Sequence, residues 1–127
     1  MDYGMLREVN LSYEEAIERV TASLKEQGFG VLTEIDVKAT FKKKLDIDWP
    51  QFKILGACSP GFAHEVLSLN PQLSLMLPCN VVVRVEDGKT LVSAIDPMMM
   101  VANENHPRLH EIATEVKTKL TAALEAL

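Results

Sequence analysis

The sequence predicts an α+β fold, a two-layer sandwich in which an antiparallel-rich sheet carries helices on one face. Strand-type and helix-type hydrophobic patterns alternate through the first half of the chain. Two long apolar strands then flank Asp87-Gly88, which is a strong hairpin signal. A helical apolar stripe fills the C-terminal end of the sequence. This order of elements favours one open sheet covered by helices.

Composition and charge limit the kind of protein. The 127 residues suit a single domain spanning residues 1–127, and 47% hydrophobic with 24% charged residues is typical of a globular protein. No signal peptide and no membrane-length apolar run is visible, so we expect a cytoplasmic protein with reduced thiols and no membrane partner. The formal net charge of -5 argues against a nucleic-acid partner.

The N-terminal elements are predicted from alternation and capping residues. Residues 3–9 alternate loosely and predict a first strand. Ser12 and Glu15 form a capping box that predicts the start of a helix, and Gly28 supplies a left-handed residue for its end. Alternating apolar residues from 31 to 37 predict a second strand.

A short basic segment follows, and Ala39, Phe41 and Leu45 predict one or two helical turns within it. Its lysines are Lys38, Lys42, Lys43 and Lys44, and two aspartates come soon after them. We interpret the lysines as a solvated helix face rather than a phosphate-binding patch.

The second half repeats the pattern of strand and helix. Residues 52–58 predict a third strand. Ser59-Pro60 is a typical helix start, and we expect the helix that begins there to end at Asn70-Pro71. Residues 72–77 are compatible with either a helical turn or a loop. The last helix is predicted to begin at Asn105 or His106, before Pro107.

The Asp87-Gly88 turn fixes the register of the predicted hairpin. Counting inward from the turn, Val83 faces Val92, Val81 faces Ala94, and Cys79 faces Asp96. These pairs share the more apolar face, so we expect them to lie under the helices. The other face carries Val82, Leu91 and Ile95 among polar residues, and we expect this half-apolar surface to form a homodimer interface.

Two cysteine-bearing segments give the only pointer to a functional site. If the third strand pairs antiparallel with the first hairpin strand, the end of one lies beside the start of the other. We then expect one edge of the sheet to gather five candidate ligand-binding residues, Cys58, Ser59, Cys79, Asn80 and Asp96.

Cys58 is the candidate catalytic residue of this group. It precedes a helix start, where the helix dipole and free backbone N–H groups favour a thiolate. The alternative is that both cysteines are small buried hydrophobes, which is how free cysteine commonly behaves. The carboxylate of Asp96 weakens the reactive interpretation of this edge, because a nearby negative charge disfavours a thiolate.

Metal and cofactor signals are weak. The two cysteines, Asp96, two histidines and Met98-Met99-Met100 include ligands that suit a soft metal. No spacing matches a zinc pattern, so we predict no metal site and leave the cofactor unknown. We interpret the methionine run as a flexible apolar segment that fills a groove.

At these same cysteine-bearing segments the sequence resembles the prokaryotic domain-of-unknown-function 302 family. The matching stretches are residues 36–42, 52–60, 77–81 and 95–97, and the resemblance covers nearly the whole chain. It implies a TATA-binding-protein-like β-α-β(4)-α arrangement, commonly as a homodimer, without implying DNA binding. The family brings no settled activity. Ser59 stands where asparagine is more usual in the family, and both residues cap helices.

The sequence thus leaves three function classes open. The first is a small binding or accessory module, with a pocket for a small-molecule ligand at the Cys58/Cys79 edge. The second is a thiol-dependent enzyme or redox protein that uses Cys58. The third is a structural interaction domain. The pattern leaves the ligand, the reaction and the physiological partner undetermined.

Overall fold

The computed structural model describes residues 2–127. Five antiparallel strands form one sheet in the order β1-β5-β4-β3-β2. The strands are β1 (Gly4–Val9), β2 (Gly30–Asp36), β3 (Phe52–Cys58), β4 (Cys79–Glu86) and β5 (Lys89–Ile95). The helices are α1 (Tyr13–Glu26), α2 (Val37–Leu45), α3 (Pro60–Leu69) and α4 (Pro107–Glu125), with 3-10 helices η1 (Pro71–Met76) and η2 (Pro97–Val101). The predicted two-layer α+β fold is confirmed.

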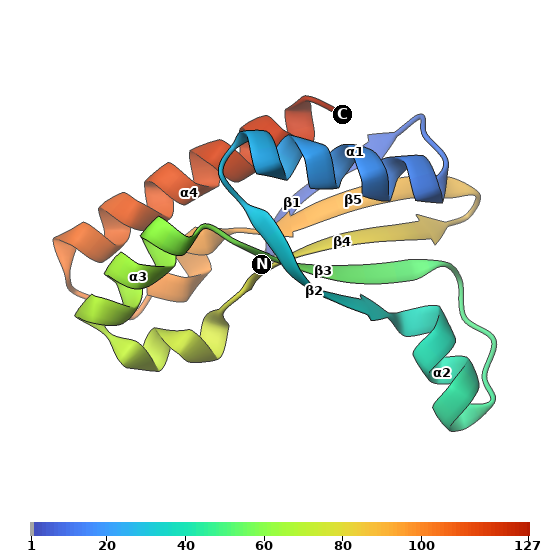
Figure 1. Ribbon diagram of the computed structural model, residues 1–127, viewed down its shortest axis with the longest axis horizontal. Coiled ribbons are helices and arrows are strands. Elements are labelled where there is room, and N and C mark those ends of the chain that lie inside the picture. Colours follow the sequence, from blue (N-terminus) through green and yellow to red (C-terminus); the bar gives the residue numbers. More distant parts are fainter. Residues whose placement is uncertain (1) are drawn as a thin grey trace.

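The helices α1 and α4 run side by side over the sheet, and α3 with η1 lies toward the other end of α4 (Figure 1). Four α1 residues are buried, and α4 buries seven. A buried hydrogen bond from the Ser23 hydroxyl to the Ala123 carbonyl, 2.6 Å long, joins the two helices. The same face of the sheet supplies fully buried Leu55, Val81 and Val83. The main core therefore lies between this face and the α1–α4 pair.

Individual capping residues determine where α1 begins and ends and where α2 begins. The Ser12 hydroxyl accepts a hydrogen bond from the Glu15 backbone N–H at 3.1 Å, which confirms the predicted N-cap. Gly28 has φ +86° and lies just after the end of α1, as predicted. The helix α2 begins where the Asp36 carboxylate accepts from the Ala39 N–H at 2.9 Å.

The hairpin confirms the predicted register. Asp87 and Gly88 both have positive φ, so the two-residue turn has the twist that a tight hairpin needs. Glu86 pairs with Lys89 across it. The paired stretch also contains the predicted partners Val83–Val92 and Val81–Ala94. It ends at Val81 and Ala94, two residues short of Cys79 and Asp96.

The opposite face of the sheet has no helix over it in residues 2–127 and is called the open face below. One row of cross-strand partners runs across all five strands, and its members are Leu6, Ser93, Val82, Ile54 and Ile35. A neighbouring row contains Glu8, Leu91, Arg84 and Phe52. The predicted half-apolar character of this face is confirmed, and whether it forms a dimer is treated as a proposal below.

Candidate functional site

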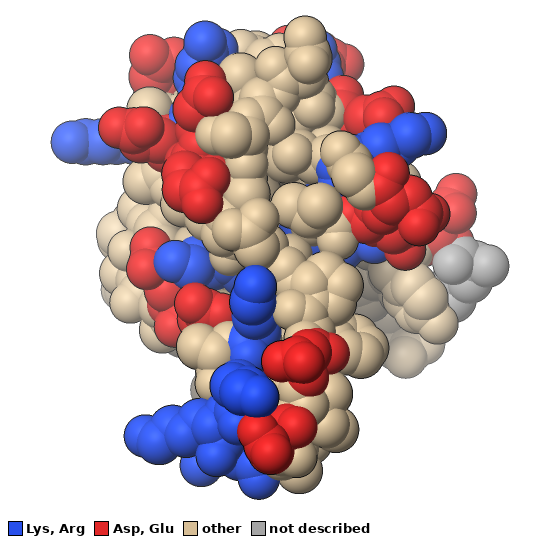
Figure 2. Space-filling view, turned by 90° about the vertical axis from the view of Figure 1, so that its right-hand side faces the viewer, with Lys and Arg blue, Asp and Glu red and all other residues tan. Residues whose placement is uncertain are grey.

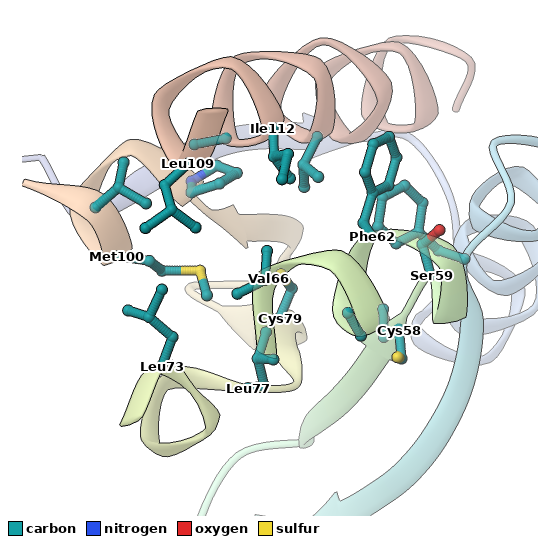
Figure 3. Close-up of a pocket in the computed structure, with 17 residues that line it drawn as sticks. Cys58, Ser59, Phe62, Val66, Leu73, Leu77, Cys79, Met100, Leu109 and Ile112 are labelled. Atoms are coloured by element: carbon teal, nitrogen blue, oxygen red, sulfur yellow. The ribbon is translucent and has the colours of Figure 1, made fainter. Parts of the chain in front are cut away.

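A cavity lies at the end of the sheet where β3 stops and β4 starts. It is enclosed by α3, α4, η1 and η2, and Figure 3 shows its lining side chains converging from these elements. The lining consists of Phe29, Ala57, Cys58, Ser59, Phe62, Ala63, Val66, Leu73, Leu77, Cys79, Pro97, Met100, Val101, Leu109, Ile112, Ala113 and Val116. The cavity holds about 50 Å³ of free space. None of these lining residues carries a charged side chain, so the site suits an apolar group.

The cavity exists because two hydrophobic clusters meet there without merging. The main core ends near Cys79 and Ile112, while Leu73, Val101 and Leu109 form a separate cluster at the far end of α4. The helix α3 spans the gap, but none of its own residues is buried. It therefore covers the cavity with half-buried side chains and leaves free space beneath it.

Ser59 ends the strand and begins the helix. Its backbone is extended (φ -103°, ψ 108°), and Pro60 follows at the first helical position, as the sequence predicts. The Ser59 side chain makes no capping hydrogen bond. Ser59 is the lining residue that carries a hydroxyl group, while the surface of the cavity itself is almost wholly apolar.

The two cysteines reach the same end of the sheet, as predicted, but they are not a pair. Both thiols are free. Cys79 pairs with Ala57, and Cys58 pairs with Gly30, so the two cysteines alternate onto opposite faces of the sheet. Figure 3 shows Cys79 among the central lining residues and Cys58 at the margin.

Their environments differ accordingly. Cys79 is 6% exposed, and this burial, with a smaller contribution from Cys58, raises the pKa of the Cys79 thiol to about 11. Cys79 is therefore a neutral thiol at physiological pH. Cys58 is half-buried and precedes α3, so it is the more accessible of the two.

Asn80 and Asp96 lie outside the cavity. Asn80 is exposed and lines a separate shallow hollow with Pro78, Ile95 and Met99. One Asp96 carboxylate oxygen accepts from the Met98 N–H and the other from the Lys117 ammonium, each at 2.9 Å. The structure thus brings Cys58, Ser59 and Cys79 to one cavity but leaves Asn80 and Asp96 beside it.

The Asp96 side chain stabilises the start of the 3-10 helix η2. Burial alone would raise the pKa of its carboxyl group, but the hydrogen bonds from Lys117 and from the Met98 backbone outweigh it and hold the pKa below its usual value. The carboxylate is therefore ionised at neutral pH. It caps η2, which delivers Met100 to the cavity wall.

A charged clasp on the surface holds α3 against α4. The Arg108 guanidinium donates to both carboxylate oxygens of Glu65 and also to Glu111. The hydrogen bond from Arg108 lowers the pKa of Glu65, so this carboxylate stays ionised. This exposed clasp and the apolar contacts under Phe62 and Val66 connect α3 to its neighbours, and an exposed ion pair of this kind contributes little to stability.

Several residues that line the cavity were not among the site residues predicted from the sequence. Leu73 comes from residues 72–77, which form the 3-10 helix η1 and resolve the ambiguity over that segment. Met100 comes from the methionine run, which forms the 3-10 helix η2 and lines the cavity. Leu109 and Ile112 belong to the long C-terminal stripe. The signal that could have found the site was the surplus of apolar positions on these three segments.

No group of three or more Cys, His, Asp or Glu side chains is placed to hold a metal ion within residues 2–127. Nor is any helix there long and apolar enough to cross a membrane.

Fold and site together define a small α+β sandwich with an apolar cavity at one end of an open antiparallel sheet. A family model described as domain of unknown function DUF302 matches residues 5–127. The chain therefore belongs to the DUF302 family.

The match extends to the solved structures. The chain resembles an uncharacterized conserved DUF302 protein from Bacillus stearothermophilus, determined by crystallography. The two share 35% sequence identity and a TM-score of 0.91 over 99% of this chain and 98% of that one. None of the curated proteins matches. The predicted family resemblance is confirmed, and no function comes with it.

Proposed function

We propose that residues 1–127 form one domain, a cytoplasmic homodimeric binding or accessory module that takes the apolar part of a small molecule into the Cys79 cavity. One observation carries this proposal, the convergence of apolar side chains from α3, α4, η1 and η2 around free space. Ligand sites are typically concave and mostly apolar, with few polar groups that fix orientation. Ser59 and Cys58 at the margin are the groups of this kind.

The size of the cavity limits the range of ligands that can fit in it. Sites for ordinary small molecules enclose roughly 300–1,000 Å³. The 50 Å³ seen here accommodates only a short, slender aliphatic group unless α3 moves outward. Because α3 has no buried residue, outward movement exposes less apolar surface than the same movement of α1 or α4 would. The ligand we expect is an uncharged aliphatic chain with one small polar end.

The test uses 1-hexanol as the probe and amide NMR spectra as the readout. We expect saturable shifts at residues of α3, η2 and the cavity side of α4. Ala63→Leu places a larger side chain in the cavity and should weaken this binding at least tenfold. Ala22→Leu is the matched control, because Ala22 is an exposed helical alanine of α1. Shifts without saturation, or equal binding by both variants, would refute the cavity as the site.

The homodimer is proposed through the open face. Its apolar row crosses the sheet from Leu6 to Ile35, whose side chains are 61% and 51% exposed. Contiguous apolar surface of this kind typically marks an interaction site. Light scattering of the purified protein should give the dimer mass at micromolar concentration, and Leu91→Glu should weaken the dimer. A monomer mass would exclude the assembly and leave the cavity proposal intact.

A second candidate is a thiol-dependent enzyme or redox protein that uses Cys58. It is favoured by the half-buried position of Cys58 at the cavity margin, directly before α3. Iodoacetamide labelling followed by mass spectrometry distinguishes the two functions. Fast labelling of Cys58 at neutral pH that 1-hexanol suppresses would support thiol chemistry at the site. Labelling of both thiols only after unfolding would eliminate this candidate, while the binding module and a structural interaction domain would survive.

A further inference from the structure

A hollow on the surface of the protein shares part of its wall with the Cys79 cavity. It is the hollow that Asn80 lines, called the outer hollow below, and it holds about 350 Å³ of free space. Leu77 and Met100 line both the outer hollow and the cavity. The two spaces are therefore neighbours, and these two residues, called the partition below, stand between them.

The partition lies at the end of the sheet, where its two faces meet. Cys79 and Asn80 are consecutive residues of β4, so their side chains point to opposite faces. Cys79 lines the cavity, and Asn80 lines the outer hollow. Leu77 lies just before β4, and Met100 belongs to η2, which follows β5. The cavity and the outer hollow therefore meet around the strand ends rather than through the sheet.

The side chains of the partition are apolar and adaptable. Leu77 and Met100 are both half-buried, so neither is enclosed on all sides by the core. Methionine is unbranched and flexible, and it fills gaps of irregular shape. Figure 3 shows Leu77 and Met100 on the side of the cavity away from Phe62 and Ser59. We expect a change of side-chain conformation at Met100 to connect the two spaces without outward movement of α3.

The outer hollow is open, mostly apolar and uncharged. Leu75 and Met76 of η1 belong to its lining and are 83% and 50% exposed. None of its lining residues carries a charged side chain, and Asn80 supplies an amide that can both donate and accept hydrogen bonds. Charged side chains are by contrast spread over the side of the molecule where α2 projects (Figure 2). The outer hollow therefore suits an uncharged ligand with a large apolar part.

The two spaces together remove the limit on ligand size that the cavity sets alone. With α3 in place, the cavity takes only a short aliphatic group. Sites for ordinary small molecules enclose roughly 300–1,000 Å³, and the cavity and the outer hollow together reach this range. An alkyl chain that begins at Asn80 and ends beside Cys79 would occupy both spaces.

We propose that the outer hollow and the Cys79 cavity form one continuous site for an uncharged amphiphile with a medium-length alkyl chain, such as a fatty alcohol. The alkyl chain passes between Leu77 and Met100 into the cavity, and the polar end hydrogen-bonds to the Asn80 amide. This inference rests on the binding function proposed above and names the ligand class for it. It places the polar end of the ligand at Asn80, across the partition from Ser59.

A series of alcohols, 1-hexanol, 1-octanol and 1-decanol, tests the continuity of the site by amide NMR titration. Each added methylene group is buried if the two spaces join, so the dissociation constant should fall about threefold per methylene up to 1-decanol. The shifts caused by 1-decanol should include residues 76–80 and 95–100. A dissociation constant that stops falling beyond 1-hexanol would overturn this inference and leave the cavity as the binding site. Absence of saturable binding by any of the alcohols would refute the proposed function itself.

Variants on the two sides of the partition separate the two spaces. Met99 lines only the outer hollow, and Ala63 lines only the cavity. Met99→Asp should weaken 1-decanol at least tenfold and change 1-hexanol less than twofold, whereas Ala63→Leu should weaken both. Leu45→Asp is the matched control, because Leu45 is an exposed apolar residue on α2, and it should change neither.

Two outcomes of this comparison would overturn the inference. If 1-decanol binds Ala63→Leu as tightly as the wild type, the alcohol lies in the outer hollow alone. If 1-decanol binds Met99→Asp as tightly as the wild type, the chain extends in another direction, as it would after outward movement of α3. Either result would show that the two spaces do not form one site.

A substitution at Asn80 tests the polar end and keeps the inference falsifiable if circular dichroism shows that Met99→Asp fails to fold. Asn80 is exposed, so Asn80→Ala leaves the core untouched. It removes one hydrogen bond to the ligand and should weaken 1-decanol about fivefold. Asn105→Ala, at an exposed asparagine before α4, is the control and should have no effect. Equal binding by Asn80→Ala and the wild type, or a larger loss in Ser59→Ala, would place the polar end elsewhere and contradict the inference.

Discussion

The two ends of the helical layer differ in how closely their side chains are packed. At one end α1 and α4 bury side chains almost completely, and Val20, Leu24 and Leu120 are 0% exposed. At the other end α3 packs against α4 and η1 beyond the strand ends with no buried residue, and half-buried Phe62 and Val66 and the Arg108–Glu65 clasp connect it to its neighbours. The apolar cavity described above lies at this second end.

This difference teaches how a small domain can combine a stable core with a loosely packed cavity of the kind proposed above as a ligand site. The tightly packed end supplies most of the apolar burial and therefore most of the stability. The loosely packed end contributes less, so it can rearrange around a ligand at lower cost in free energy. The cysteine-bearing strand ends lie at the boundary, where Ala57 and Cys79 pair under α3.

The largest expected effect compares matched valines on two helices. Val20→Ala on α1 removes two fully buried methyl groups and should cost about 2–3 kcal/mol of unfolding free energy. Val66→Ala on α3 removes methyl groups that already border free space, so it should cost about 1 kcal/mol or less. Both substitutions gain the same helix propensity. Urea unfolding measures the difference, and equal losses would contradict it.

The next effect concerns pH and the buried thiol. The pKa of Cys79 is raised from 9.0 to about 11 in the folded protein, so the unfolded chain loses this proton first as pH rises. Cys79 therefore lowers stability progressively from about pH 9 to pH 11, by roughly 2–3 kcal/mol in total, and has no such effect below pH 9. We expect Cys79→Ala to show a correspondingly flatter fall in unfolding free energy over this window. Parallel curves for the two proteins would show that the thiol is not buried.

The last comparison concerns two glycines, one in the sheet and one on α3, and its single-site losses are the least certain to exceed about 1 kcal/mol. A Cβ at Gly56 would lie 2.1 Å from Thr33 Oγ1 and 2.7 Å from Pro78 Cγ, so Gly56→Ala should cost about 1–3 kcal/mol. A Cβ at Gly61 on α3 meets nothing within 4 Å, so Gly61→Ala should gain up to about 1 kcal/mol. Thermal unfolding checks the opposite signs. A loss at Gly61 would show that α3 is packed as closely as the sheet.

The fold was predictable from sequence because its signals are local. The Ser12 cap, the Asp87-Gly88 turn and the Ser59-Pro60 helix start each act over a few residues, and each holds in the structure. The hairpin register followed from the turn alone, which placed Val81 and Val83 correctly under the helices.

The site was only half predictable because it depends on how elements pack. Sequence spacing brought Cys58 and Cys79 to one sheet end, but the register with β2 and β4 decided that they alternate onto opposite faces. Asp96 was expected at the site, yet its carboxylate caps η2 and binds Lys117. The surplus of apolar positions on η1, η2 and α4 indicates lining residues, but the free space between the two core clusters depends on how these elements pack against one another.

Xenon binding tests the central claim most directly, because xenon occupies accessible apolar cavities without needing a polar partner. The measurement is diffraction from a crystal of this protein held under xenon pressure. The account predicts a xenon atom enclosed by Phe62, Cys79 and Met100, and a weaker or absent one in Ala63→Leu. Xenon found only elsewhere in the molecule, or equally strong in the variant, would contradict the claim that this end of the sheet is the binding site.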